Sequence, residues 1–306
     1  MKSRQKIIPH LWFDFQANEA SEFYTKLFPD SKIDAITRYP AEGQKVHGQP
    51  EGTVMTVNFD LSGYRFIALN GGPHFRINPS ISFFVVCETI EEIDDLWKNL
   101  SKNGRVLMPI NQYPWSEKYG WIQDQFGVSW QLSLGKHKDV NQKITPCLMF
   151  TGNQCGRAEE ALNIYTNIFE NSSVDGISRY DGTESQDKKG TIKHGQFSLG
   201  GEKMMVMDSA MDHPFNFNEG ISLLIECNNQ EEIDFFWDKL SEGGDPNAQQ
   251  CGWLKDKFGV SWQVCPSELH IMLLDKDPEK VARVTNAFLQ MKKFDLKVIQ
   301  KIYNNE

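Results

Sequence analysis

The sequence predicts an α+β protein in which one unit of two modules is written twice, and two observations support this prediction. Long stretches of the first half return in the same order in the second half, at a period of about 138 residues, which is far longer than the period of a solenoid repeat. Each half also shows the pattern strand, helix and three strands two times over. The chain therefore contains four βαβββ modules.

The repeat is visible in four pairs of segments. "IIPHLWF" (7–13) returns as "ITPCLMF" (144–150), and "FYTKLFPDSKIDAITRY" (23–39) returns as "IYTNIFENSSVDGISRY" (164–180). "ISFFVVCETIEEIDDLWKNLSKNG" (81–104) returns as "ISLLIECNNQEEIDFFWDKLSEGG" (221–244). "GWIQDQFGVSWQL" (120–132) returns as "GWLKDKFGVSWQV" (252–264). The unit has been duplicated as a whole.

The two copies are joined by the polar stretch "GKHKDVNQK", which is typical of a linker. We expect a first domain at 1–136, a linker at 137–143, a second domain at 144–266 and a helical C-terminal tail at 267–306. In the tail, Asp277 can cap a helix that has Pro278 at its first position. An apolar stripe follows at helical spacing and indicates a helix packed on the sheets or on a partner: Val281, Val284, Phe288 and Met291.

Each element of the first half has its own signature. The run at 7–15 is apolar and of strand length, whereas 17–28 has apolar residues at helical spacing. The segment at 32–39 alternates as a strand does, and 53–70 is typical of two strands about a Ser-Gly turn. A strand at 80–87 and a helix at 89–104 follow, with Thr89 as the N-cap toward Glu92 and Gly104 as the stop. Strands at 105–110, 119–125 and 128–133 complete the unit.

The phrase shared by 120–132 and 252–264 is predicted to be a hairpin. Its aromatic side chains supply apolar surface, and Gly127 can take the positive φ that a tight turn needs. We interpret the Trp, Phe, Asp and Gly positions as structural. Gln131 and Gln263 are the exceptions, because strand alternation places Gln131 on the face opposite to that of Trp130.

Composition excludes several partners. The formal net charge is -9 and there is no long run of Lys or Arg, which argues against nucleic acid and anionic membranes. The six Cys show no CxxC pair and no zinc spacing, so we expect reduced thiols. No apolar run has the length of a signal peptide or a membrane span. We expect a soluble, cytoplasmic protein.

On these segments the chain resembles the vicinal oxygen chelate (glyoxalase/bleomycin-resistance) superfamily and, within it, the PhnB-like group, often labelled as a 3-demethylubiquinone-9 3-methyltransferase domain. The resemblance extends to the tail "DPEKVARVTNAFLQMKKFDLKVI" (277–299). It implies a glyoxalase-like fold whose modules form two eight-stranded cups. It leaves the activity open, because that superfamily contains isomerases, dioxygenases, thiol transferases and drug-sequestering proteins. A methyltransferase is not expected, because no Gly-rich turn leads from a first strand into a helix.

The resemblance also implies where a metal ion would lie. Metal-using members take His, Glu or Gln ligands from the first, fourth, fifth and last strands of a module pair. Here the first-strand position falls on His10 and the last-strand positions on Gln131 and Gln263, while the fourth and fifth strands offer no His or Glu. We therefore predict no cofactor. If a divalent metal binds, we expect His10 and Gln131 as ligands, with His74 from a loop that folds inward.

Two functions stay open. In the one we favour, the protein binds a small, partly apolar molecule in a metal-free cup lined by His10, Trp12, Trp115 and Gln131. Gln263 is the corresponding ligand-binding residue of the second cup, which we expect to be degenerate. In the alternative, it is a metal-dependent vicinal-oxygen-chelate enzyme of the lyase, dioxygenase or thiol transferase type. The sequence therefore does not decide whether the protein is an enzyme.

The arrangement of the modules is also open, because they can pair within each half or be exchanged between the halves. We favour a monomer, as a fused pseudo-dimer, over a homodimer. The segment "NQYPWSEKYGW" (111–121) has no counterpart of equal length in the second half. We expect an aromatic loop next to the mouth of the cup, which is either a packed surface loop, as we favour, or a lid over an apolar ligand.

Overall fold

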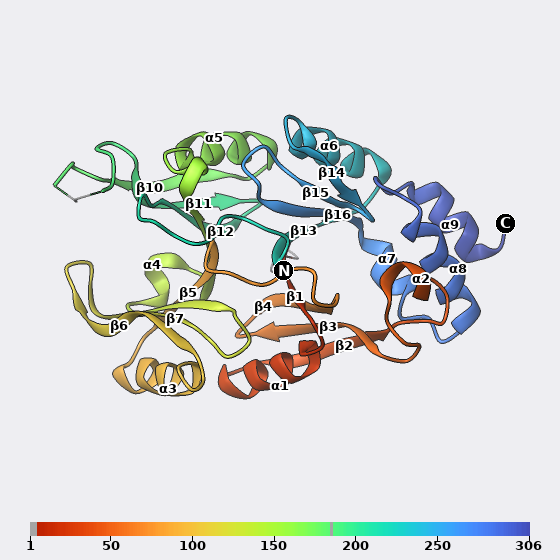
Figure 1. Cartoon of the computed structure of the whole chain (residues 1–306), viewed down its shortest axis with the longest axis horizontal. Coiled ribbons are helices and arrows are strands. Elements are labelled where there is room, and N and C mark those ends of the chain that lie inside the picture. Colours follow the sequence, from red (N-terminus) through yellow and green to blue (C-terminus); the bar gives the residue numbers. More distant parts are fainter. Residues whose placement is uncertain (1–4, 184–185) are drawn as a thin grey trace.

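The computed structural model describes residues 5–183 and 186–306, which form two eight-stranded mixed sheets with helices on their outer sides (Figure 1). We call them sheet A and sheet B. Sheet A has the strand order β14 (Asp245–Gln250), β15 (Trp253–Lys255), β16 (Ser261–Pro266), β13 (Ile221–Cys227), β1 (Ile7–Phe13), β4 (Tyr64–Asn70), β3 (Val54–Leu61) and β2 (Lys32–Arg38). Sheet B has the order β10 (Ser173–Arg179), β11 (Ile192–Leu199), β12 (Glu202–Asp208), β9 (Ile144–Phe150), β5 (Ile81–Cys87), β8 (Ser129–Leu134), β7 (Ser116–Gln123) and β6 (Arg105–Tyr113).

Each module contributes one helix to the outside of the sheets. These helices are α1 (Ala17–Leu27), α3 (Ile90–Leu100), α5 (Ala158–Ile168) and α6 (Gln230–Ser241). Three short helices lie in connections: α2 (Gln44–His47), α4 (His137–Val140) and the 3-10 helix η1 (Gly152–Gln154). The tail forms α7 (Ser267–Met272), α8 (Pro278–Leu289) and α9 (Leu296–Asn304). Of the helices that the structure describes, none is long and apolar enough to cross a membrane.

The predicted α+β architecture of four βαβββ modules and its local signals are confirmed. The Thr89 hydroxyl accepts a hydrogen bond from the Glu92 backbone N–H and so caps α3. Asp277 caps α8 in the same way, and Pro278 is the first residue of that helix. Gly127 has φ +89° in the hairpin turn. The expected loop at 111–121 is wrong, because β6 and β7 continue through it and form a longer hairpin.

The modules pair across the two halves. β1 of the first module runs antiparallel to β13 of the fourth, with His10 opposite Ser222. β5 of the second module runs antiparallel to β9 of the third, with Ser82 opposite Cys147. Each cup therefore takes one module from each half, which answers the question that the sequence left open. The expected domain boundaries stay a prediction, because they follow the repeat and not the sheets.

One face of each sheet lies in a single shared core. Phe66 of sheet A and Phe83 of sheet B belong to the same apolar cluster, with ring centroids 5.0 Å apart. Figure 1 shows α1 and α3 below this core and α5 and α6 above it. The backs of the two sheets are therefore covered, and their other faces form the two cups.

A buried aspartate ties the two modules of the first half together. One carboxylate oxygen of Asp124 accepts hydrogen bonds from the backbone N–H groups of Phe126 and Val128, at 2.9 and 3.0 Å, and so shapes the hairpin turn. The other oxygen accepts from the Trp130 indole at 2.8 Å and from the hydroxyl of Tyr24 in α1 at 2.7 Å. Burial raises the pKa of Asp124 to about 6. The carboxylate thus joins a sheet B hairpin to a helix of sheet A's first module.

The second half repeats this arrangement. Asp256 accepts hydrogen bonds from the Tyr165 hydroxyl at 2.5 Å and from the Trp262 indole at 2.9 Å. Burial raises the pKa of this carboxyl as well. The repeated phrase therefore carries the link between modules, and the structural interpretation of its Asp position is confirmed.

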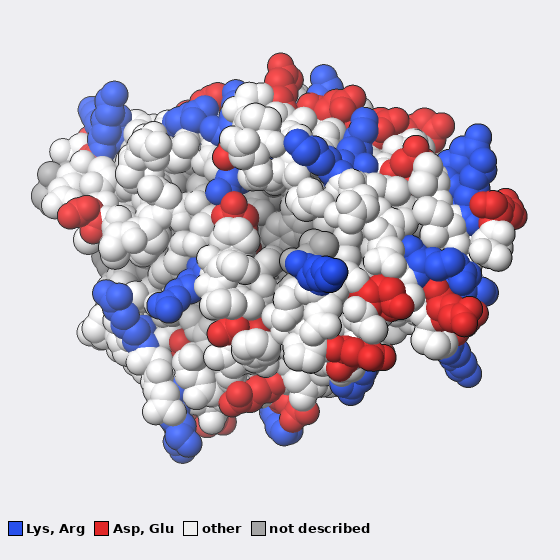
Figure 2. Space-filling view, turned by 45° about the vertical axis from the view of Figure 1, so that its right-hand side comes forward, with Lys and Arg blue, Asp and Glu red and all other residues white. Residues whose placement is uncertain are grey.

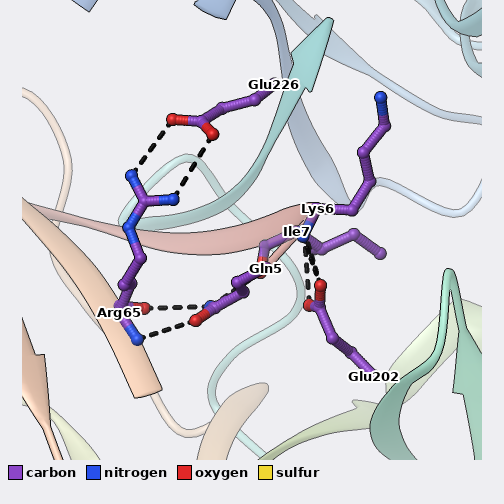
Figure 3. A network of polar contacts seen from close by, with 6 residues as sticks. All are labelled: Gln5, Lys6, Ile7, Arg65, Glu202 and Glu226. Atoms are coloured by element: carbon purple, nitrogen blue, oxygen red, sulfur yellow. Dashed lines mark hydrogen bonds and ion pairs between the residues drawn. The ribbon is translucent and has the colours of Figure 1, made fainter. Parts of the chain in front are cut away.

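A second polar contact joins the sheets where β1 begins (Figure 3). The carboxylate of Glu202, at the start of β12, accepts hydrogen bonds from the backbone N–H groups of Lys6 and Ile7. Burial raises the pKa of this carboxyl to about 8. Sheet B thus supplies the acceptor for the first backbone donors of a central strand of sheet A.

Removal of one donor from the buried aspartate tests the first link. Tyr24→Phe leaves the Asp124 carboxylate with one hydrogen bond fewer in a buried site, so we expect the free energy of unfolding to fall by about 1–3 kcal/mol in urea denaturation. Tyr113→Phe is the control, because that hydroxyl makes a local contact on an exposed hairpin and should change stability by about 0.5 kcal/mol or less. Equal losses in both variants would contradict the proposed link.

Candidate functional site

The open face of sheet A holds a cavity of about 240 Å³. Side chains of β1, β3, β4, β13 and β16 form its floor, and residues of α7 and α8 cover it. In Figure 1 the tail lies at the right-hand end of the molecule, beside the fourth module. The cavity is thus enclosed by the first module, the fourth module and the tail.

Three polar side chains lie in one row across the open face of sheet A, and two of them, His10 and Asn58, line the cavity. His10 of β1 is opposite Ser222 of β13 on one side and opposite Ile67 of β4 on the other. Ile67 is in turn opposite Asn58 of β3. Residues opposite each other on neighbouring strands point to the same face of the sheet. His10, Ser222 and Asn58 therefore form a buried polar strip under the cavity.

Gln263 of β16 extends this strip. Its side-chain nitrogen donates a hydrogen bond to the Ser222 hydroxyl at 2.8 Å, which orients the amide. The Gln263 side-chain oxygen has no hydrogen-bond partner among the residues that the structure describes. The amide is 4% exposed and lines the cavity, so this oxygen is available to a bound molecule.

His10 is neutral in this site. Burial lowers the pKa of its imidazole to about 3. Its ring meets the edge of Trp253, with ring centroids 5.6 Å apart. A neutral imidazole donates a hydrogen bond at one nitrogen and accepts one at the other. His10 can therefore offer either role but brings no charge.

The cavity contains hydrogen-bonding capacity that the protein does not use. Three of the residues that line it carry a buried polar atom without a partner in the described structure: His10 Nδ1, Asn58 Nδ2 and Thr285 Oγ1. Each such group costs about 1–3 kcal/mol when it stays unpaired. Three of them around one cavity indicate a place for a molecule that forms hydrogen bonds.

The carboxylate in the floor is neutralised by a cation. Glu226 lines the cavity, and its two oxygens accept hydrogen bonds from the Arg65 guanidinium at 3.1 and 3.3 Å (Figure 3). The side chain of Gln5 pairs with the Arg65 backbone on the other side. Trp253, Leu224 and other apolar side chains make up most of the remaining wall.

The open face of sheet B is filled by larger side chains. Phe84, Tyr119 and Met149 belong to apolar clusters that cover this face. In sheet A, Leu224 takes the position of Phe84. Cys251 takes the position of Tyr119, as the alignment of "YGW" with "CGW" shows.

The glutamine of sheet B has all of its hydrogen bonds inside the protein. The Gln131 nitrogen donates to the Ser82 hydroxyl at 2.8 Å, and its oxygen accepts from the Tyr119 hydroxyl at 2.7 Å. Because Cys251 replaces Tyr119 in sheet A, the oxygen of Gln263 lacks such a partner. The two glutamines of the repeat thus lie in different environments.

The expectation that His10 and Gln131 line one cup is wrong. Gln131 belongs to the second module, which pairs with the third, whereas His10 lies on sheet A. The glutamine that shares a cup with His10 is Gln263. The expectation that the cup with Gln263 is the degenerate one is reversed by the same exchange of modules.

Other expected site residues lie outside the cavity wall. The Trp12 indole donates to the Gly72 carbonyl at 2.8 Å and packs behind Trp253, with ring centroids 5.8 Å apart. Trp115 is 56% exposed at the tip of the β6–β7 hairpin, where it stacks on Tyr113. It belongs to sheet B. His74 is exposed in the loop after β4 and does not fold into the cup.

The possible ligands in the cup of sheet A do not fit a divalent metal ion. At the positions that metal-using members employ, its first, fifth and last strands offer one imidazole, one hydroxyl and one amide, from His10, Ser222 and Gln263, and this amide already donates to the hydroxyl. The Glu226 carboxylate also lines the cavity, but both of its oxygens accept hydrogen bonds from Arg65. The fourth strand presents Leu69, because Ala68 faces the core. Zinc sites in proteins use three or four His, Cys or carboxylate ligands. Within the described ranges, no group of three or more His, Cys, Asp or Glu could hold a metal ion.

Sequence reasoning missed three residues of the cavity. Asn58 gave a weak signal, as the polar residue that alternates with buried apolar ones in β3. Thr285 lies in the apolar face of α8, where a buried hydroxyl is unusual. Trp253 was interpreted as structural because it is part of the repeated phrase, but it forms part of the wall.

Comparison with known proteins identifies relatives of the chain. The family model described as 3-demethylubiquinone-9 3-methyltransferase matches residues 5–133 and 142–265. The structure of a putative 3-demethylubiquinone-9 3-methyltransferase, PhnB protein, from Bacillus cereus is 43% identical, covering 43% of this chain and 100% of that chain, with a TM-score of 0.40. Glyoxalase I from Zea mays is 10% identical, covering 88% of this chain and 95% of that chain, with a TM-score of 0.58, and so shares the fold. No curated protein matches the chain.

The neutral state of His10 makes the stability depend on pH. An unfolded histidine takes up a proton near its ordinary pKa of 6.5, whereas folded His10 does so only near 3. The unfolded state therefore binds more protons below pH 6.5, and the folded state loses stability as the pH falls from 6.5 to 3. In urea denaturation, His10→Asn should lose about 1.6 kcal/mol less than the natural protein between pH 6.5 and 5. Identical losses would show that His10 is protonated in the fold.

Proposed function

The chain belongs to the 3-demethylubiquinone-9 3-methyltransferase family, and within this family we propose that it binds a small, partly apolar molecule, without a metal ion, in the cup of sheet A. One observation carries the proposal. A largely apolar cavity is lined by three residues whose buried polar atoms have no partner in the described protein. Binding sites for small molecules combine an apolar wall with a few such placed polar groups.

The difference between the two cups supports this proposal. A duplicated unit starts with two equal cups, and here one is filled by aromatic and Met side chains while the other keeps its space. The internal partner of the glutamine is present in the filled cup and absent from the hollow one. A bound molecule would take the place of this missing internal partner.

The volume of the cavity limits the size of the molecule that can bind. Sites for drug-sized molecules have volumes of roughly 300–1,000 Å³. The cavity of about 240 Å³ is smaller, so it suits a molecule built on a single ring. Acetophenone is a suitable probe, because it has one ring and one carbonyl oxygen that can accept hydrogen bonds.

A pair of matched substitutions tests which cup binds. Leu224 lies opposite Gln263, as Phe84 lies opposite Gln131 in sheet B, so the two positions are equivalent. Leu224→Phe puts the larger side chain of sheet B into the cavity of sheet A. We expect it to weaken the binding of acetophenone at least about tenfold in isothermal titration calorimetry, because it fills the space that the probe needs.

Phe84→Leu is the control, because it makes the reverse change in the other cup. Its affinity for acetophenone should equal that of the natural protein. Circular dichroism checks that both variants are folded. Equal affinities in all three proteins, or a loss in Phe84→Leu alone, would overturn the assignment of the site to sheet A.

A further inference from the structure

A threonine of the tail has an unused hydroxyl at the cavity. Thr285 is 1% exposed on the buried face of α8, next to Val284, and it lines the cavity. Its Oγ1 has no hydrogen-bond partner in the described structure. Since a buried hydroxyl without a partner destabilises the fold, a valine of the same shape would suit this position better if packing were its purpose.

Other helical threonines of the chain show the ordinary arrangement. The Thr25 hydroxyl donates to the Ser21 carbonyl at 2.8 Å, and the Thr166 hydroxyl donates to the Leu162 carbonyl at 2.9 Å. Both bonds follow the pattern in which a threonine satisfies itself on the carbonyl four residues earlier. Thr285 does not make this bond, although its position in the helix would allow it. Its hydroxyl is therefore kept for another partner.

The floor of the cavity offers a second unpaired group. Asn58 is 7% exposed, and its side-chain nitrogen lacks an acceptor within the described protein. An amide N–H group can only donate, so its partner must carry an acceptor atom. On the sheet side, Glu226 is neutralised by Arg65, and this leaves no free charge in the floor for a charged molecule.

We propose that the tail is part of the binding site, and that Thr285 and Asn58 hydrogen-bond a small uncharged carbonyl compound held between α8 and sheet A. The proposal rests on the function proposed above and names the chemical class of its ligand. It gives the single tail of this duplicated chain a role in selectivity. The tail follows β16 directly, so it covers the cup of sheet A and leaves that of sheet B uncovered.

Two probes of equal shape test the class of ligand. Acetophenone and α-methylstyrene differ in one group, because a C=CH₂ group replaces the carbonyl. We expect the natural protein to bind acetophenone about tenfold more tightly in calorimetric titration, since one or two net hydrogen bonds have this effect.

Two substitutions test the residues. Thr285→Val and Asn58→Leu keep the approximate shapes of the side chains and remove their hydrogen-bonding atoms. Each should reduce the preference for acetophenone about threefold to tenfold and leave the affinity for α-methylstyrene unchanged. Thr25→Val is the control on a half-buried face of α1 that does not line the cavity, and it should keep the full preference.

The melting temperature separates a role in binding from a role in folding. Without a probe, Thr285→Val should melt at the same temperature as the natural protein or a few degrees higher, because it removes an unpaired buried hydroxyl. A lower melting temperature together with an unchanged probe preference would assign the hydroxyl to the fold and overturn the proposal.

The outcomes distinguish the two proposals. If neither probe binds the natural protein, the function proposed for the cup fails, and the present inference fails with it. If both probes bind equally well, or if the preference survives both substitutions, the cup is a binding site but the carbonyl class and the role of the tail are wrong.

Discussion

The architecture depends on one interaction, the hydrogen bond between a helical tyrosine and a buried aspartate in the hairpin of the next module. Tyr24 reaches Asp124 in the first half, and Tyr165 reaches Asp256 in the second. Each bond fixes two consecutive modules back to back, so that they serve different sheets. The other half completes the sheet of each module, and the exchange of modules in both cups agrees with this constraint.

The duplication allows the two cups to differ. Each cup contains one module from each copy, so a substitution in one copy alters a single cup while the other keeps its original residue. Aromatic and Met side chains accumulate in sheet B, where Tyr119 satisfies Gln131. In sheet A, Cys251 leaves the oxygen of Gln263 open, and the tail encloses the space beside it. After the duplication, the cup of sheet B is filled by side chains and the cup of sheet A is hollow.

Local signals in the sequence predicted most of the fold, because hydrophobic period and capping act over a few residues. Thr89 and Asp277 cap their helices as expected, and the phrase around Gly127 forms its hairpin. The site was harder to predict. Strand alternation places His10 on the open face of a sheet, but it does not say whether Gln131 or Gln263 lies on the same sheet. That choice depends on contacts between the modules, such as the one that Asp124 makes, and these have no local signature. Thr285 could not be predicted either, because its helix has no counterpart in the first half with which to compare it.

The central claim is that the cup of sheet A, and not that of sheet B, receives a small molecule. Methionines report on both cups, because Met55 lines the cavity of sheet A whereas Met149 and Met205 fill the face of sheet B. The most direct measurement is an NMR titration of protein labelled with ¹³C in the methionine methyl groups, with acetophenone as the probe. The account predicts that the Met55 resonance shifts and saturates while those of Met149 and Met205 stay in place. Saturating shifts of Met149 and Met205 with a constant Met55 signal would contradict it.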